Sequence, residues 1–230
     1  FDGSNSGSSS RNLTVENSST STSTVVFWLS SLGDGAGASN NTFKNLIIKG
    51  GSNSVTSTYG IYAAGTTIST TGTGGDNDNL TIQNNELLKS YRAVFVRGTA
   101  TGLNDGLNIT QNIIGSSDSL NYVTFRGIDI TNATAPGISN NTLFNIIITT
   151  AAANAAIDLG TNVTNALVSN NLIQTVQGTA SGTYGINISS GTGTSGVTIV
   201  NNMISGVTGT GSTTANSTIS NPFGIRITGG

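Results

Sequence analysis

Residues 138–146 read ISNNTLFNI, which places two adjacent asparagines between apolar residues. Close copies recur as ASNNTF at 38–43, IQNNEL at 82–87, VSNNLI at 168–173 and IVNNMI at 199–204. A Gln-Asn version occurs at 111–112. The second members of the amide pairs are Asn41, Asn85, Asn112, Asn141, Asn171 and Asn202. The last four steps between these residues are 27, 29, 30 and 31 residues long. With a half-copy, LTVENSS, at 13–19, the chain contains about seven units, and this period indicates a repeat architecture.

The apolar residues around each amide pair alternate with polar ones, which is the periodicity of a strand. A second alternating signature follows in most units, for example GIDI at 127–130 and GINI at 185–188. Short strands that repeat every 30 residues or so predict an all-β fold, a single-stranded parallel β-helix with about seven coils. Because parallel crossovers are nearly always right-handed, we expect a right-handed solenoid. Residues 1–230 should form one domain, with residues 63–79 as a protruding loop.

The amide pairs have a structural explanation in such a solenoid. A coil needs a sharp bend between strands, and asparagine tolerates the left-handed backbone conformation better than any residue except glycine. Amides stacked from coil to coil can also hydrogen-bond one another along the axis. We therefore predict an asparagine ladder with six members, namely Asn41, Asn85, Asn112, Asn141, Asn171 and Asn202.

The repeated units resemble the parallel β-helix repeats of the pectate-lyase-like superfamily, over about residues 11–230. They are also similar to Ser/Thr/Gly/Asn-rich, adhesin-like surface proteins of bacteria. The resemblance implies an extracellular or cell-surface location, a polysaccharide or cell-surface glycan as partner, and a segment of a larger surface protein. It specifies an activity less well than a fold, because one fold hosts many functions.

The signature G-I-x-I exposes one column of side chains, because its two isoleucine-type positions face inward. Read along the chain, this outward column is Tyr62, Phe95, Asp129, Asp158, Asn187 and Arg226. Two stacked carboxylates beside Arg126 loosely resemble the sites of polysaccharide lyases and glycoside hydrolases of the superfamily. The bland interpretation is that Asp129 and Asp158 are solvated surface residues, which titrate normally. Replacing Asp129 by alanine should then change stability by about 0.5 kcal/mol or less.

Composition narrows the alternatives. Only 8% of the residues are charged, the net charge is −2, and the few Lys and Arg residues are scattered, which argues against a nucleic-acid partner. The chain has no cysteine and no histidine, which removes thiolate sites, most zinc chemistry and the commonest general base. No apolar run is long enough to cross a membrane. The acidic turn GGDNDN at 74–79 falls short of a calcium loop, so we predict neither a metal nor a cofactor.

Three functional hypotheses follow. The first is a non-enzymatic, structural or adhesin-like module. The second is a lyase or hydrolase that uses Asp129 and Asp158 with support from Arg126. The third is a carbohydrate-binding face without catalysis, centred on the rings of Tyr62 and Phe95, since aromatic rings stack on the apolar faces of sugars.

Overall fold

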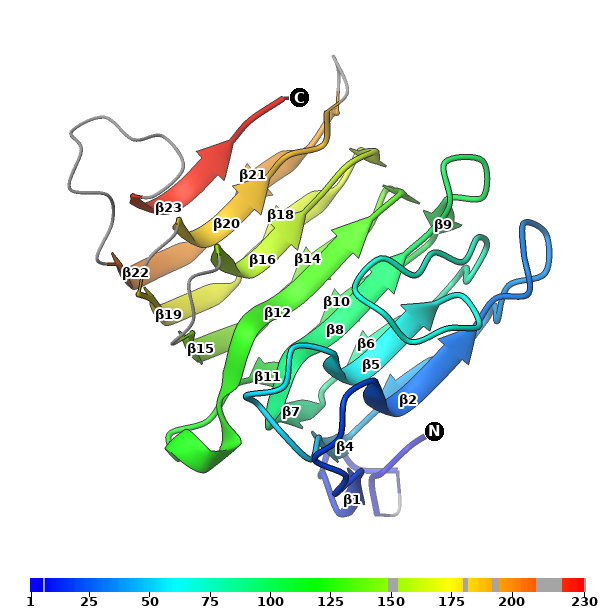
Figure 1. Ribbon diagram of the computed structural model, residues 1–230, viewed down its shortest axis with the longest axis horizontal. Helices are drawn as coiled ribbons and strands as arrows, with labels where there is room; N and C mark the ends of the chain where they lie inside the picture. Colours follow the sequence, from blue (N-terminus) through cyan, green and yellow to red (C-terminus); the bar gives the residue numbers. More distant parts are fainter. Residues whose placement is uncertain (6, 149–152, 180–181, 192–194, 210–220, 230) are drawn as a thin grey trace.

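The chain folds into a parallel β-solenoid whose coils follow one another along a single axis (Figure 1). The structure is a computed structural model and describes residues 1–230 except 6, 149–152, 180–181, 192–194, 210–220 and 230. Every strand pairing among the described residues is parallel, and their one helical element is the 3₁₀ turn Ser119–Asn121. The predicted β-helix is confirmed, but it has about six turns instead of seven. The half-copy at 13–19 accounts for the difference, because its coil contributes named strands to only two of the three faces.

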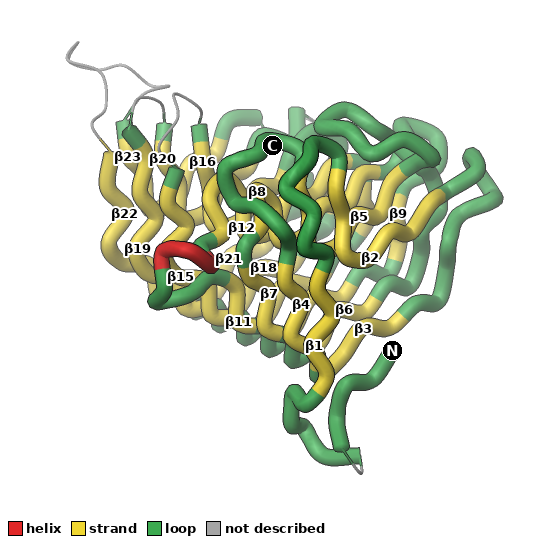
Figure 2. The backbone as a smooth tube through the Cα atoms, turned by 60° about the horizontal axis from the view of Figure 1, so that its bottom comes forward, coloured by secondary structure: helices red, strands yellow, loops and turns green. Residues whose placement is uncertain are grey.

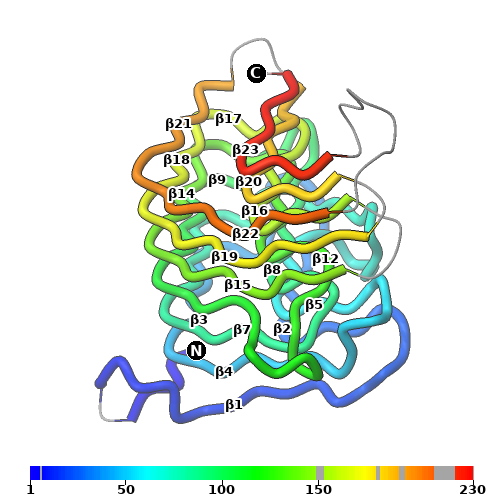
Figure 3. The backbone as a smooth tube through the Cα atoms, turned by 90° about the vertical axis from the view of Figure 1, so that its left-hand side faces the viewer, coloured from blue at the N-terminus to red at the C-terminus, as the bar shows by residue number. Residues whose placement is uncertain are grey.

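Each coil contributes strands to three faces, and Figure 3 shows the coils stacked from the blue N-terminal coil to the red C-terminal strand. The first, which we call the long-strand face, consists of β2 (Thr24–Ser30), β5 (Thr58–Ala64), β8 (Ser90–Arg97), β12 (Val123–Thr131), β16 (Asn154–Leu159), β20 (Thr183–Ile188) and β23 (Pro222–Ile227). The second consists of β3 (Thr42–Lys44), β6 (Thr81–Gln83), β10 (Asn108–Thr110), β14 (Gly137–Ser139), β18 (Leu167–Ser169) and β21 (Thr198–Val200). The third consists of β1 (Leu13–Glu16), β4 (Leu46–Lys49), β7 (Glu86–Leu88), β11 (Ile113–Ile114), β15 (Thr142–Ile147), β19 (Leu172–Gly178) and β22 (Met203–Gly209). The short strands β9 (Asn104–Asp105), β13 (Ala133–Thr134) and β17 (Val163–Thr164) pair at the corner that follows the long-strand face.

The core consists of aligned apolar columns, one residue per coil. On the second face, Ile82, Ile109, Ile138 and Val168 lie in register and are fully buried. Full burial of such a side chain contributes about 1.5–3 kcal/mol relative to exposure, so the columns supply most of the driving force for stacking.

On the long-strand face, the glycine of G-I-x-I points inward, toward the neighbouring coil. A Cβ at Gly127 would lie 2.6 Å from the carbonyl oxygen of Ala156, which explains the glycine. Arg126, immediately before this glycine, therefore points outward, and so does Asp129, two residues after it. Each long strand thus has two outward positions three residues apart.

The asparagine ladder runs inside the corner between the second and third faces. The Nδ2 of each rung donates to the Oδ1 of the next, at 3.1, 3.0, 2.9 and 2.9 Å along the series Asn85, Asn112, Asn141, Asn171 and Asn202. From Asn112 onward, each Oδ1 also accepts the backbone N–H of the preceding rung, as Asn171 does from Asn141 at 3.0 Å. The residue before each rung has a positive φ, as in Asn140 at 57°, so one amide makes the bend and its neighbour stacks inside.

Asn41 is not a rung, so the predicted six-residue ladder was wrong in its first member. The register aligns Phe43 with Ile82, which places Leu46 at the level of Asn85, and the Leu46 N–H donates to Asn85 Oδ1. Asn45 supplies the bend there, with φ 59°. Asn41 lies one corner earlier, where its Nδ2 donates to the carbonyl of Ala38. Alignment on the amide pair alone misled the prediction, because the first full unit keeps the bend asparagine but replaces the rung with leucine.

The segment predicted as a protruding loop, 63–79, does not protrude throughout. Ala63 and Ala64 belong to β5, and the residues that follow fold back over the long-strand face, as the cyan trace in Figure 1 shows. The Tyr62 hydroxyl donates to the carbonyl of Thr67, and Arg97 donates to the carbonyl of Thr70. The segment therefore covers the outward side chains beneath it. Figure 2 shows loops, in green, above and beside the strands labelled β5 and β9.

Candidate functional site

The predicted outward column exists, in the predicted register. Neighbouring strands pair Tyr62 with Phe95, Phe95 with Asp129, and Asp129 with Asp158. The column continues through Asn187 and Arg226, and it begins one coil earlier than predicted, at Trp28. We call these seven residues the outer row: Trp28, Tyr62, Phe95, Asp129, Asp158, Asn187 and Arg226.

The central members of the outer row are not solvated, which corrects the expectation of ordinary surface carboxylates. Asp129 is 1% exposed and Asp158 is 4% exposed. A second outward column, three residues earlier in each strand, covers them, and it contains Tyr59, Arg92, Arg126, Ala155 and Tyr184. A solenoid of this kind can therefore bury charge on its outer side.

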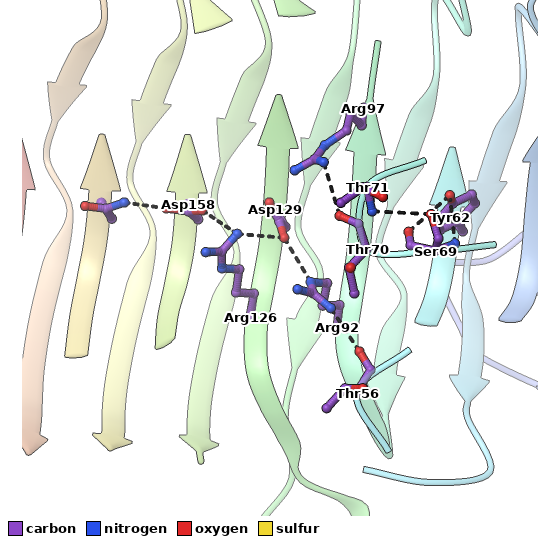
Figure 4. A network of polar contacts seen from close by, with 11 residues as sticks. Thr56, Tyr62, Ser69, Thr70, Thr71, Arg92, Arg97, Arg126, Asp129 and Asp158 are labelled. Atoms are coloured by element: carbon purple, nitrogen blue, oxygen red, sulfur yellow. Dashed lines mark hydrogen bonds and ion pairs between the residues drawn. The ribbon is translucent and has the colours of Figure 1, made fainter. Parts of the chain in front are cut away.

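Alternating charges hold the two aspartates in place (Figure 4). Asp129 Oδ2 accepts hydrogen bonds from Arg92 Nε at 3.0 Å and from Arg126 Nη1 at 2.9 Å. The same Arg126 Nη1 lies 2.6 Å from Asp158 Oδ2, so this guanidinium bridges the two carboxylates. These contacts bring together all three residues of the predicted acidic pair and its arginine.

The row continues as amide and guanidinium contacts beyond Asp158. Asn187 Nδ2 donates to Asp158 Oδ1 at 2.5 Å, and Arg226 Nη1 donates to Asn187 Oδ1 at 3.0 Å. Both oxygens of Asp158 therefore have donors on neighbouring coils. Sequence reasoning placed Asn187 and Arg226 in the column but gave them no role in the site.

Aromatic rings flank the guanidiniums. Arg92 lies 4.5 Å from the ring centroid of Phe125, and Arg126 lies 4.7 Å from the same centroid. Arg226 lies 5.0 Å from the ring of Tyr184. Attraction between a cation and an aromatic face contributes about 0.5–2 kcal/mol, more where water is excluded. The sequence prediction did not include Phe125, which lies four residues before Asp129 on the same strand.

Burial raises the pKa of the Asp158 carboxyl above its ordinary value, because the charged form loses its hydration. The charge of Arg126 opposes this shift, and the nearby Asp129 adds to it. The pKa of the Asp158 carboxyl is therefore above its ordinary value, contrary to the expectation of normal titration for this residue.

A pocket of about 260 Å³ opens beside this end of the row. It exists because Ala155 interrupts a column of large side chains, between Arg126 on one coil and Tyr184 on the next. The described lining residues are Arg126, Ala153, Ala155, Asp158, Tyr184, Asn187 and Arg226. Arg126 Nε is buried there, with no hydrogen-bond partner among the described residues. We call this cavity the charged pocket.

Tyr62 and Phe95 adjoin as predicted, with ring centroids 5.0 Å apart and planes 11° apart. Their exposures of 0% and 1% leave no open face for a sugar, because the segment after β5 lies over Tyr62. Trp28 is the member of the row with an exposed ring, at 45%, and its Nε1 donates to the carbonyl of Gly65. Tyr62 and Phe95 therefore lie in the predicted outward column, but neither ring is exposed to solvent, so these two residues cannot form the carbohydrate-binding face of the third hypothesis.

The fold and the register define a parallel β-solenoid with a buried asparagine ladder and a charged row on one face. The sequence matches no protein-family model, no curated protein and no solved structure. In the described part of the chain, no three carboxylates come together in a way that could hold a metal ion. A search of the same residues finds no helix with the length and apolar character of a membrane span.

Proposed function

We propose that the chain is a non-catalytic structural module of a larger bacterial surface protein, located outside the cell and similar in role to adhesin stalks. Even repeats, a low content of charged residues and a continuous internal ladder suit a rod that carries other parts of a surface protein. The observation that carries the proposal is the occupation of the two stacked carboxylates by donors from the protein itself.

Catalysis by a carboxylate pair needs oxygens that can reach a substrate or an attacking water. Here Asp129 Oδ2 serves two guanidiniums, and the two oxygens of Asp158 serve Arg126 and Asn187. The whole sequence contains no histidine that could move a proton in their place. These carboxylates hold the arginine side chains in place, and their bonded oxygens are not available to act as a general base.

A panel of acidic and neutral polysaccharides tests this proposal. The purified protein should release neither new reducing ends nor the ultraviolet-absorbing unsaturated ends that a lyase creates. Cleavage that Asp158→Asn abolishes would instead establish the lyase or hydrolase alternative, with Asp129, Asp158 and Arg126 as its working residues.

A second candidate function is glycan binding without catalysis, and the charged pocket favours it. Tyr184 offers an aromatic wall, while Asn187 and Arg226 offer donors and acceptors beside it. The partner in this proposal is a polysaccharide or cell-surface glycan, with the binding face moved from Tyr62 and Phe95 to this pocket.

A glycan array followed by titration calorimetry tests the second candidate. Arg226→Ala should weaken a glycan that binds here by about tenfold or more, because a hydrogen bond to a charged group contributes about 1.5–3 kcal/mol. Trp28→Ala is the matched control, since Trp28 belongs to the same row at its far end. Loss of binding in the Trp28 variant alone would move the glycan site to β2.

A further inference from the structure

A second cavity, of about 310 Å³, lies at the corner where the chain enters the long-strand face. Four successive coils build it, through the segment before β5, the start of β8, the segment around the 3₁₀ turn, and the end of β15. The described lining residues are Asn53, Ser54, Tyr91, Ser119, Tyr122, Thr124, Ile147 and Ile148. We call this cavity the tyrosine pocket. It shares no described lining residue with the charged pocket.

The walls of the tyrosine pocket are held in place before any ligand arrives. Thr124 Oγ1 donates to the carbonyl of Asn53, and Asn53 Nδ2 donates to the carbonyl of Ser119 at 3.3 Å, so the two loops close on each other. The Lys89 N–H donates to the carbonyl of Asn121, which anchors the 3₁₀ turn, drawn in red in Figure 2. A preformed cavity avoids the entropy cost of ordering loops on binding.

One wall is aromatic and rigid. Tyr91 is 6% exposed and stacks on Phe125 with centroids 4.8 Å apart and planes 13° apart. Ile148, which is 1% exposed, belongs to the same apolar cluster. Tyr122 lies one residue after the 3₁₀ turn and is half-buried. These side chains give the cavity a mainly apolar interior.

The rim is polar but uncharged. None of the described lining residues is Asp, Glu, Lys or Arg. In the described part of the chain, the hydroxyls of Tyr91, Tyr122 and Ser119 and the Oδ1 of Asn53 form no hydrogen bond with protein. These atoms are accessible to solvent, so a ligand that displaces water from them must replace its hydrogen bonds.

The lining selects a class of ligand. An ion would enter without a counter-charge, at a large desolvation cost. A wholly apolar ligand would leave the hydroxyls and the amide oxygen without hydrogen-bond partners. This costs about 1–3 kcal/mol of binding free energy for each group that becomes buried in this way. A small neutral ring with an apolar face and a hydroxyl edge satisfies both parts of the cavity. We propose that the tyrosine pocket binds the pyranose ring of a neutral sugar, with its apolar face toward the tyrosines.

Titration of the 1–230 chain with methyl glucoside, methyl galactoside and N-acetylglucosamine, followed by saturation-transfer difference NMR, tests the proposal. At least one of the three sugars should bind, with its ring protons close to the Tyr122 ring. Tyr122→Ala should abolish the transfer. Tyr91→Phe keeps the ring that packs on Phe125 but removes its hydroxyl, so it should weaken binding by about 2–10-fold.

Leu120→Ala is the matched control, because Leu120 lies in the same turn, is 73% exposed and does not line the cavity. This variant and Arg226→Ala should both bind the neutral sugar normally, which separates this proposal from glycan binding in the charged pocket. No transfer from any of the three sugars would overturn it. Unchanged transfer in Tyr122→Ala, or tighter binding of p-cresol than of any sugar at the same site, would overturn it as well.

Discussion

The asparagine ladder inside the solenoid and the outer row on the long-strand face both follow the solenoid axis, each with one residue per coil. The ladder repeats a single residue type from Asn85 to Asn202. The outer row changes from aromatic to acidic, then to an amide and a guanidinium. Both are polar and buried in their central coils, but they reach that state by different chemistry.

An amide carries both a donor and an acceptor, so each asparagine complements an identical neighbour and the ladder can extend through any number of coils. A carboxylate only accepts, and two of them in register repel each other. Asp129 and Asp158 are compatible because Arg126, from the adjoining column, lies between them. A uniform polar stack needs only the repeat, whereas a mixed stack needs particular neighbours from outside the stack.

The largest expected effect is at the outer row. Asp129→Ala should lower the free energy of unfolding by about 3–5 kcal/mol, because it leaves the buried Arg92 without a carboxylate and removes one of the two carboxylates that flank Arg126. Urea denaturation of the variant and the wild type measures this loss. A loss below about 1 kcal/mol would mean that the cluster is hydrated in solution and that the row behaves as an ordinary surface.

The ladder should be less sensitive at a single rung. Asn141→Leu should cost about 1–3 kcal/mol, because the amides of Asn112 and Asn171 each lose a partner while the added apolar side chain is tolerated in the core. Asn202→Leu is the internal comparison and should cost less, since this rung is only half-buried. Equal denaturation midpoints for Asn141→Leu and wild type would contradict the ladder as a stabilising element.

The two regions should also differ in their response to pH, since the ladder does not titrate. The pKa of Asp158 is raised in the folded state, so between the ordinary Asp pKa and this raised value the folded state holds a proton that the unfolded state has released. The stability that this group contributes is therefore full below the ordinary Asp pKa of about 3.9 and is lost as the pH rises through the raised value. Asp158→Asn should remove this part of the pH dependence.

Thermal unfolding of wild type and Asp158→Asn, at pH values from below the ordinary Asp pKa to above the raised pKa of Asp158, measures this effect. The difference in the free energy of unfolding between the two proteins gives the contribution of Asp158 at each pH. Asp2 and Asp34 have lowered pKa values and change stability in the opposite sense at lower pH, but they are present in both proteins and cancel in the difference. A difference that stays constant with pH would show that Asp158 titrates normally.

The smallest expected effect is at the residue that repeats the ladder motif without belonging to the ladder. Asn41→Ala should cost about 0.5 kcal/mol or less, because the amide of Asn41 donates only to the nearby carbonyls of Ala38 and Ser39, near the surface. The same urea assay as for Asn141 measures it. A loss as large as that of Asn141→Leu would restore Asn41 to the ladder.

The sequence by itself determined the architecture, the register and most of the ladder. Strand periodicity and a repeat near 30 residues leave few folds, and aligned apolar residues such as Ile138 and Val168 can be buried together only if the coils stack in register. For the same reason the repeat alone predicts the order of the outer row from Tyr62 to Arg226, and the strand register confirms it. Because the coils repeat, the positions of the buried residues in one coil predict the positions of the buried residues in the next.

Only the tertiary structure decided what covers that row and which amide pair stacks. The burial of Asp129 depends on Arg92 and Arg126, which lie in a second outward column. This column exists because the next residue, Ala93 or Gly127, is small and lies on the inner side, and no alternation of polar and apolar residues signals such a column. The cover over Tyr62 depends on how an irregular segment folds back, and irregular segments carry no period. Asn41 and Asn141 share a local motif, but they lie at different corners of their coils, and only Asn141 meets an asparagine of the next coil. Local sequence sets which groups are available, and contacts between coils set which of them lose water.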